Sequence, residues 1–280
     1  MFLGGQLPGK ALLHLRQLTI FGMICRLPQS FVYKIAVNQL TSAKQSSGSW
    51  FRQIRNLCLL YGLPPAISLL HKPLSKLAFK CLIKSKVISY WEDILRAEAL
   101  NLRTKSLRYF RPEYMSLTKP HTIWLSCGSN PYETHKAVIQ AKMLSGRYVT
   151  DQLSRHWTSN KDGICTIPGC SGTDVGTLEH LLLFCPSLAD SRTRVTELWL
   201  TAAADNPDLS DIINEILSSH DHAPDTAVQF LLDCSSFPAV IYLKQTFGPE
   251  YVYPLFYLTR SWCYSMHRAR MTKIGLPQYR

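Results

Sequence analysis

Apolar residues recur every three or four positions along most of the chain, which is the spacing that places them on one face of a helix. No run of alternating polar and apolar residues is long enough to predict a sheet. We therefore predict an all-α fold, a helical array. Helices are expected over residues 10–26, 50–61, 72–84, 130–146, 149–157, 195–200, 209–217, 227–234 and 252–271.

Charge divides the chain into two unlike halves. Residues 1–150 hold 21 Lys and Arg against 5 Asp and Glu, whereas residues 151–280 hold 10 against 14. The first carboxylate in the chain is Glu92. Such a one-sided distribution favours an anionic partner, most often nucleic acid. An N-terminus without acids also fits a mitochondrial transit peptide, although those are usually much shorter and rich in serine.

A row of lysines runs along the predicted helix 72–84. Their four-residue spacing stacks the ammonium groups along one side of a helix, over about 18 Å. A solvated helix face is one interpretation, and a surface that follows a phosphate backbone is the other. The lysines are Lys72, Lys76, Lys80 and Lys84. The apolar face of the same helix is predicted to hold Leu74, Leu77, Ala78, Cys81 and Leu82.

A second cationic segment follows, in which aromatic residues are interleaved with the cations. Aromatic rings can stack on unpaired bases while cations hold the phosphates, and the same rings could equally pack in a core. The cations are Arg103, Lys105, Arg108 and Arg111, and the aromatic residues are Tyr109, Phe110 and Tyr114.

One group of residues has the spacing of a metal site. Cys165, Cys170, His180 and Cys185 form a C-x4-C-x9-H-x4-C pattern. Three thiolates and an imidazole complete a tetrahedral zinc site, which would be structural because no position stays open for a reactive water. His180 and Cys185 would not share a face of an α-helix. Pro186 disfavours helical backbone at Cys185, so we expect the histidine on a helix and the cysteine at its exit.

The alternative to a metal site is a set of buried thiols beside a hydrogen-bonded histidine, since free cysteine is among the most buried residue types. His156 is a possible substitute ligand. The remaining cysteines occur in apolar or aromatic contexts and are predicted to be core residues. They are Cys25, Cys58, Cys81, Cys127, Cys234 and Cys263.

The residues around this pattern resemble a known family. Met143–Tyr148, Trp157, Cys165, Cys170 and Thr177–Pro186 together resemble the segment that follows the polymerase domain in reverse transcriptases of non-LTR (LINE-type) retrotransposons. The phrase Leu-Glu-His-Leu-Leu-Leu-Phe-Cys-Pro is its most specific part. The resemblance is distinctive over residues 140–190 and more diffuse before them.

The resemblance implies a zinc-knuckle-like module that helps to bind the element's RNA or target DNA. Its implied ligands are Cys165, Cys170, His180 and Cys185. The four-residue spacing of the first cysteine pair departs from the family pattern. We expect a fragment derived from the C-terminal part of such a protein.

Catalysis is not expected. Nucleotide polymerisation needs carboxylates that hold two metal ions, and this chain contains no adjacent Asp-Asp pair. The family's endonuclease domain is also missing, and no nucleophile elbow, phosphate-binding loop or HExxH pair occurs. We therefore predict that the protein is not an enzyme and takes no small-molecule substrate.

Cysteine content and hydropathy indicate a nuclear or cytoplasmic protein that is neither secreted nor membrane-bound. The nine cysteines are odd in number and mostly scattered, unlike a disulfide framework. The apolar run 57–70 is too short to span a bilayer and is interrupted by Gly62, Pro64 and Pro65.

Together these observations predict three regions. Residues 1–150 form a basic helical region, 151–190 a zinc-stapled turn-helix insertion of the CCHC type, and 191–280 a C-terminal helical region. The predicted function is non-catalytic binding of RNA or single-stranded DNA with Zn²⁺ as the cofactor. A structural protein-interaction module and an inactive retroelement relic without zinc are the alternatives.

Overall fold

The computed structural model describes residues 2–42, 48–101, 107–156, 162–219 and 222–275. Over these residues the fold is all-α, as predicted, and no strand is present beyond one isolated antiparallel bridge between Ile164 and Val175. The helices pack into two units. Unit 1 comprises residues 1–100 with 116–119, and unit 2 comprises residues 101–115 with 120–280. Packing thus divides the chain near residue 100. The division into residues 1–150, 151–190 and 191–280 remains a prediction from the sequence.

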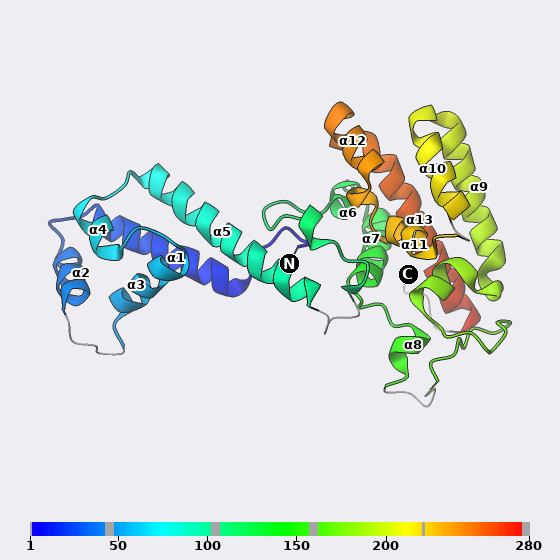
Figure 1. Ribbon diagram of the computed structural model, residues 1–280, viewed down its shortest axis with the longest axis horizontal. Helices are drawn as coiled ribbons and strands as arrows, with labels where there is room; N and C mark the ends of the chain where they lie inside the picture. The colour runs from blue at the N-terminus through cyan, green and yellow to red at the C-terminus, as the bar shows by residue number, and fades with distance from the viewer. Residues whose placement is uncertain (1, 43–47, 102–106, 157–161, 220–221, 276–280) are drawn as a thin grey trace. The chain divides into compact units, whose positions relative to one another are not determined.

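The described residues of unit 1 form five helices, which follow one another in chain order (Figure 1). They are α1 (Gly9–Cys25), α2 (Phe31–Thr41), α3 (Trp50–Leu60), α4 (Ala66–His71) and α5 (Lys76–Leu100). The predicted helices 10–26 and 50–61 are confirmed as α1 and α3. Gly62 has φ +58°, and the Leu63 N–H donates to the Cys58 carbonyl oxygen at 2.8 Å, so α3 ends where glycine allows the turn.

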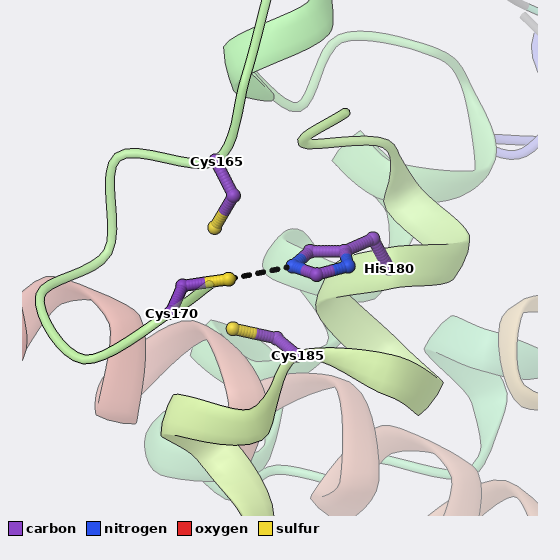
Figure 2. A group of neighbouring side chains, drawn as sticks. All are labelled: Cys165, Cys170, His180 and Cys185. Atoms are coloured by element: carbon purple, nitrogen blue, oxygen red, sulfur yellow. Dashed lines mark hydrogen bonds between the residues drawn. The ribbon is translucent and has the colours of Figure 1, made fainter. Parts of the chain in front are cut away.

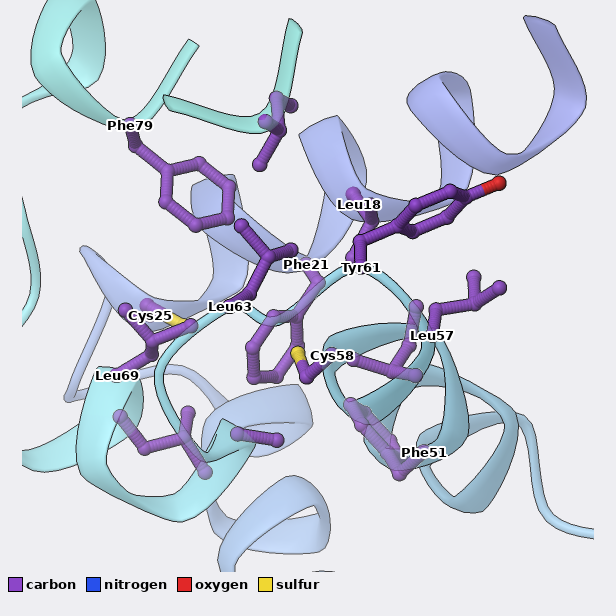
Figure 3. Packing of buried hydrophobic residues seen from close by; sticks show 14 of the residues in the cluster. Leu18, Phe21, Cys25, Phe51, Leu57, Cys58, Tyr61, Leu63, Leu69 and Phe79 are labelled. Atoms are coloured by element: carbon purple, nitrogen blue, oxygen red, sulfur yellow. The ribbon is translucent and has the colours of Figure 1, made fainter. Parts of the chain in front are cut away.

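The core of unit 1 forms where α1, α3, α4 and α5 meet. Figure 3 shows Leu18 and Phe21 of α1 packed among Cys58, Tyr61 and Phe79. Gly22 of α1 lies directly under the Phe79 ring, where a Cβ atom would come within 2.3 Å of two ring carbons. The absent side chain therefore lets α5 approach α1 closely.

The predicted apolar face of residues 72–84 was wrong. The buried residues of α5 are Phe79, Ile83 and Val87, one helical turn apart. Leu77 is 72% exposed and Cys81 is exposed too, whereas Leu82, which was also predicted for this face, is partly buried and packs against the core. The helix also starts only at Lys76 and continues to Leu100. Tertiary packing against α1 selects the larger Phe79 side chain over the predicted leucines.

Unit 2 surrounds the long C-terminal helix α13 (Tyr253–Lys273), which packs against α7, α9 and α11. Trp199 and Trp262 meet edge to face at 5.4 Å in its core, with Phe230 beside Trp199. The other helices of four or more residues are α6 (Thr122–Leu125), α7 (Pro131–Leu144), α8 (Asp151–Ser154), η3 (His180–Phe184), α9 (Ala189–Asp205), α10 (Pro207–Ser219), α11 (Pro224–Leu232), α12 (Pro238–Phe247) and η6 (Pro249–Val252).

The described helices lack a membrane-spanning candidate, since none of them is both long enough and apolar enough to cross a bilayer.

Candidate metal centre

The first two cysteines lie on a loop that folds back on itself between α8 and η3. The Cys165 N–H donates to the Asp174 carbonyl oxygen at 2.8 Å, next to the bridge between Ile164 and Val175. The Cys170 N–H donates to the Ile167 carbonyl oxygen at 3.0 Å, closing a turn whose third residue, Gly169, has φ +85°. Proline followed by a left-handed glycine suits this turn, and it brings the two sulfurs to the same side.

His180 and Cys185 are placed by an uncommon helical turn. Residues His180–Phe184 form a π-helix, in which the Cys185 N–H donates to the His180 carbonyl oxygen at 2.7 Å. Cys185 itself has extended backbone, with ψ 116°, and Pro186 follows it. The predicted arrangement, with the histidine on a helix and the cysteine at its exit, is confirmed. The π turn was not expected, and it brings residues five apart to the same side.

The four side chains converge on one point. Figure 2 shows the three sulfur atoms and the His180 ring facing one another across the gap between the loop and η3. All four ligand atoms lie within 4.8 Å of one another, and Cys170 Sγ is 3.4 Å from His180 Nε2. Sulfurs bound to one tetrahedral zinc ion would lie about 3.8 Å apart. Small shifts of the side chains are therefore enough to form such a centre.

Each of the three cysteine sulfurs accepts a hydrogen bond from a backbone N–H two residues further along the chain. The donors are Ile167 for Cys165, Gly172 for Cys170 and Ser187 for Cys185. An N–H pointed at sulfur stabilises the thiolate relative to the thiol. The backbone is thus arranged for the charged form of the ligands.

The pKa values of the thiols follow from burial and from these hydrogen bonds. Burial raises the pKa of Cys165 to about 12 and also raises the pKa of Cys185. At the more exposed Cys170, burial raises the pKa less than N–H and thiol donors lower it, so its pKa falls below the ordinary value. Three thiols crowded together do not ionise easily without a cation to compensate their charge.

The imidazole of His180 has the cysteine sulfurs on one side and a carboxylate on the other. Its Nε2 faces the sulfurs, and its Nδ1 lies 4.0 Å from a carboxylate oxygen of Asp174, which also accepts a hydrogen bond from Ser171 Oγ at 2.8 Å. Burial lowers the pKa of His180, which favours the neutral ring that binds metals. At 4.0 Å the Asp174 carboxylate is beyond hydrogen-bonding distance of Nδ1, so it acts on the ring through its negative charge.

Contacts with the rest of unit 2 hold both halves of the cluster in place. Arg192 Nη2 donates to the Cys185 carbonyl oxygen at 2.7 Å. Trp262 Nε1 of α13 donates to the Leu182 carbonyl oxygen at 3.1 Å. On the loop, Thr166 Oγ1 donates to a carboxylate oxygen of Asp151 at 2.8 Å. The cluster is therefore part of the packing of unit 2.

Sequence reasoning missed the supporting residues Asp174, Arg192 and Asp151. Asp174 lies inside the C-x9-H interval, so a search for carboxylates between the ligands would have found it. Arg192 and Asp151 lie outside the pattern, and their spacing gives no signal. The suggested substitute ligand His156 is exposed and does not belong to the cluster.

The predicted lysine row is shorter than expected. Lys76, Lys80 and Lys84 are exposed and lie in one row on α5. Lys72 is wrongly placed in that row, because it follows the end of α4 and precedes α5. Pro73 accounts for the break, since it removes a backbone donor and disfavours helical backbone at Lys72.

The second cationic segment is partly engaged in ion pairs. Arg108 Nη1 lies 3.0 Å from Glu179, and Arg108 Nη2 also pairs with Asp225. Tyr109 is buried and donates to the same two carboxylates, whereas Arg111 is exposed. Arg103 and Lys105 lie outside the described residues. The structure therefore brings Arg108 and Tyr109 into the packing of unit 2.

Among the cysteines outside the cluster, Cys81 was wrongly predicted to be a core residue. It is exposed on α5, because the buried face of that helix passes through Phe79 and Ile83. The five other cysteines are buried, as predicted. They are Cys25, Cys58, Cys127, Cys234 and Cys263.

Comparison of the chain with protein-family models, with curated proteins and with solved structures found no match. The interpretation of this cluster as a metal site therefore rests on its own residues. Cys165, Cys170, His180 and Cys185 form a group that could hold a metal ion.

Proposed function

We propose that this chain is a non-catalytic nucleic-acid-binding protein. In this proposal a structural zinc ion joins the loop that carries Cys165 to the helical turn that ends at Cys185. The resemblance of residues 140–190 to the post-polymerase region of non-LTR retrotransposon reverse transcriptases supports the same proposal, with this chain as a derived fragment. The observation that carries the binding function is the row of exposed lysines on α5 in a segment without carboxylates before Glu92.

Zinc is the metal that best fits the donor set. Thiolate and imidazole ligands suit Zn²⁺, whereas Mg²⁺ and Ca²⁺ prefer oxygen ligands. Four protein ligands fill a tetrahedral shell, so the ion would hold the fold together without activating water. Three thiolates leave the zinc centre with one net negative charge, which the nearby Arg192 guanidinium would partly compensate.

The lysine row matches a phosphate backbone by its charge and its spacing. Lys76, Lys80 and Lys84 span about 12 Å along α5. Within the described residues, none of the three lies within ion-pairing distance of a carboxylate. Exposed cations without a protein partner are available to replace the counterions of a nucleic acid, which makes binding strongly dependent on salt.

Metal content tests the zinc half of the proposal. We expect about one zinc ion per chain by mass spectrometry, and its loss in the double variant Cys165→Ser with Cys170→Ser. Cys81→Ser is the matched control, because Cys81 is an exposed cysteine outside the cluster. A folded wild-type chain that binds no zinc, or equal zinc in all three proteins, would contradict this half.

Binding of labelled RNA and single-stranded DNA tests the other half. We expect Lys76→Glu with Lys80→Glu to weaken binding at least about tenfold and to reduce the slope of log K against log salt by about 1.4. The control is Arg194→Glu with Lys244→Glu, which changes the net charge equally at exposed positions of unit 2. Both probes are measured by fluorescence anisotropy over a range of salt concentrations.

The outcome also distinguishes nucleic-acid binding from general attraction to polyanions. Tighter binding to RNA or single-stranded DNA than to heparin and polyphosphate of equal charge supports the proposal. Equal binding to all of them, or a flat response to salt, would favour the protein-interaction alternative.

A further inference from the structure

A cavity of about 480 Å³ opens among α9, α10, α11, α13 and η3, entirely within unit 2. Its volume falls in the range of small-molecule sites in proteins. Nine of the thirteen lining residues are apolar, and six of these nine are buried. The residues that form this part of the lining are Leu183, Trp199, Ile216, Ala227, Leu231 and Trp262.

The two tryptophans supply apolar surface to the cavity. Trp199 Nε1 donates to the Leu258 carbonyl oxygen at 3.3 Å, and Trp262 Nε1 donates to the Leu182 carbonyl oxygen at 3.1 Å. Because both indole N–H groups already have acceptors, the rings meet the cavity through carbon atoms. A ligand in contact with them would need an apolar body.

Arg192 gives the same cavity a cationic side. Its Nη2 donates to the Cys185 carbonyl oxygen at 2.7 Å, while its Nη1 is buried and has no protein acceptor. A buried N–H group of a charged side chain without a partner is energetically costly and calls for an explanation. The one carboxylate in the lining, Glu197, belongs to an exposed residue and forms no ion pair with Arg192 within the described part of the chain.

We propose that this cavity binds an alkyl carboxylate of medium chain length, whose carboxylate pairs with the Arg192 guanidinium and whose alkyl chain lies against the apolar wall formed by Leu183, Ile216 and Leu231. A carboxylate supplies both a negative charge to pair with the guanidinium and an oxygen atom to accept its hydrogen bond. At roughly 30 Å³ for each non-hydrogen group, the cavity volume accommodates about sixteen groups, which is enough for a chain of about ten carbons. The inference requires neither zinc nor nucleic acid, although Arg192 also donates to the carbonyl oxygen of Cys185 in the candidate metal centre.

Calorimetric titration of the full chain with decanoate, kept below its micelle concentration, tests the proposal. We expect saturable binding of one decanoate per chain, and binding of 1-decanol at least about tenfold weaker, since the alcohol lacks the charge that pairs with the guanidinium. The comparison of the two ligands on the wild-type protein does not depend on the folding of any variant. Absence of saturable binding, or equal binding of the alcohol, would overturn the proposal.

Two variants locate the ligand. Arg192→Gln removes the cation, and we expect it to weaken decanoate binding about tenfold or more while leaving 1-decanol binding nearly unchanged. Ala227→Leu fills the cavity from α11, and we expect it to weaken both ligands. Arg194→Gln is the matched control, because this exposed arginine lies on the same helix but does not line the cavity. Equal affinity of decanoate for all four proteins would show that it binds elsewhere and would overturn the assignment.

Discussion

The amide N–H of Cys185 donates to the carbonyl oxygen of His180 at 2.7 Å, so the two candidate ligands are joined across one π turn. An α-helical turn would rotate Cys185 away from the histidine, because successive residues are about 100° apart on an α-helix. The extra residue in the turn therefore makes the C-terminal pair of ligands possible. π turns occur often at functional sites, which agrees with a role in binding metal.

Deletion of Phe184 tests the importance of this turn. We expect the deletion to restore α-helical geometry, to separate the Cys185 sulfur from the His180 ring and to reduce zinc content severalfold. Phe184→Ala keeps the number of residues and is expected to retain zinc, since Phe184 is 43% exposed. Zinc content measured by mass spectrometry on both proteins checks this, and equal loss in both would assign the effect to the side chain.

Sequence alone predicted the ligands of the candidate site because they are close in the chain and chemically distinctive. Cys165, Cys170, His180 and Cys185 are separated by short intervals, and Pro168 with Gly169 marks the turn between the first two. Asp151 and Arg192 escaped prediction because their roles depend on where α8 and α9 pack. Such contacts have no regular spacing in the sequence.

Helix periodicity gave the fold class and most helix positions, but it did not give every buried face. In α5 the sequence offers two overlapping sets of apolar positions, one through Leu77 and Cys81 and one through Phe79 and Ile83. The neighbouring helix decides between them, because Gly22 leaves room for the Phe79 ring. Helices α2 (Phe31–Thr41) and α12 (Pro238–Phe247) were not predicted at all.

The contact between Gly22 and Phe79 predicts an unusual effect of alanine in a helix. Gly22→Ala should gain helix propensity, but its Cβ would overlap the ring, which is 4% exposed and has little room to move. We expect a net destabilisation of about 1–3 kcal/mol by urea unfolding, followed by a probe in unit 1. Gly9→Ala is the matched control on α1, since nothing lies near its Cβ position. A stabilisation by Gly22→Ala would contradict the close approach of the helices.

The buried ion pair between Arg260 and Glu133 predicts a large loss of stability when only one partner is removed. Arg260 is 1% exposed, and its Nε donates to Glu133 Oε2 at 2.9 Å, with Ser126 Oγ accepting from Nη1 at 2.9 Å. Glu133→Gln leaves the buried Arg260 guanidinium without its counter-ion, and also the Lys136 ammonium, which lies 2.8 Å from Glu133 Oε1. Loss of a counter-ion to a buried charge typically costs about 3–5 kcal/mol. Urea unfolding of unit 2 measures the change.

A double variant distinguishes two contributions to the free energy of unfolding. One is the cost of leaving a buried charge unpaired, and the other is the net contribution of the ion pair. Glu133→Gln combined with Arg260→Met leaves only Lys136 without its counter-ion, whereas the single Glu133→Gln variant leaves both Lys136 and Arg260. We therefore expect the double variant to be less destabilised than the single one. Greater destabilisation in the double variant would instead indicate that Arg260 is held mainly by its contacts with Ser126 and the neighbouring carbonyls.

The environment of His267 predicts how the stability of unit 2 depends on pH. Burial, together with the nearby cations Arg270 and Lys142, lowers the pKa of His267 from 6.5 to about 4. Tyr148 Oη lies 3.0 Å from His267 Nδ1, so the ring is held between α13 and the segment that follows α7. The unfolded chain therefore binds a proton that the folded chain does not bind between about pH 4 and 6.5.

Stability from this histidine should be fully present above about pH 6.5 and should fall as the pH drops toward 4, because protonation favours the unfolded state over that range. Since the ring is partly exposed, we expect a loss of at most about 2 kcal/mol after solvent screening. Denaturant unfolding between pH 4 and 7.5 should show a shallower pH dependence in His267→Gln than in the wild type. His222→Gln, which changes an exposed histidine of the same unit, should behave like the wild type. The same slope in all three proteins would mean that His267 titrates alike in the folded and unfolded chains.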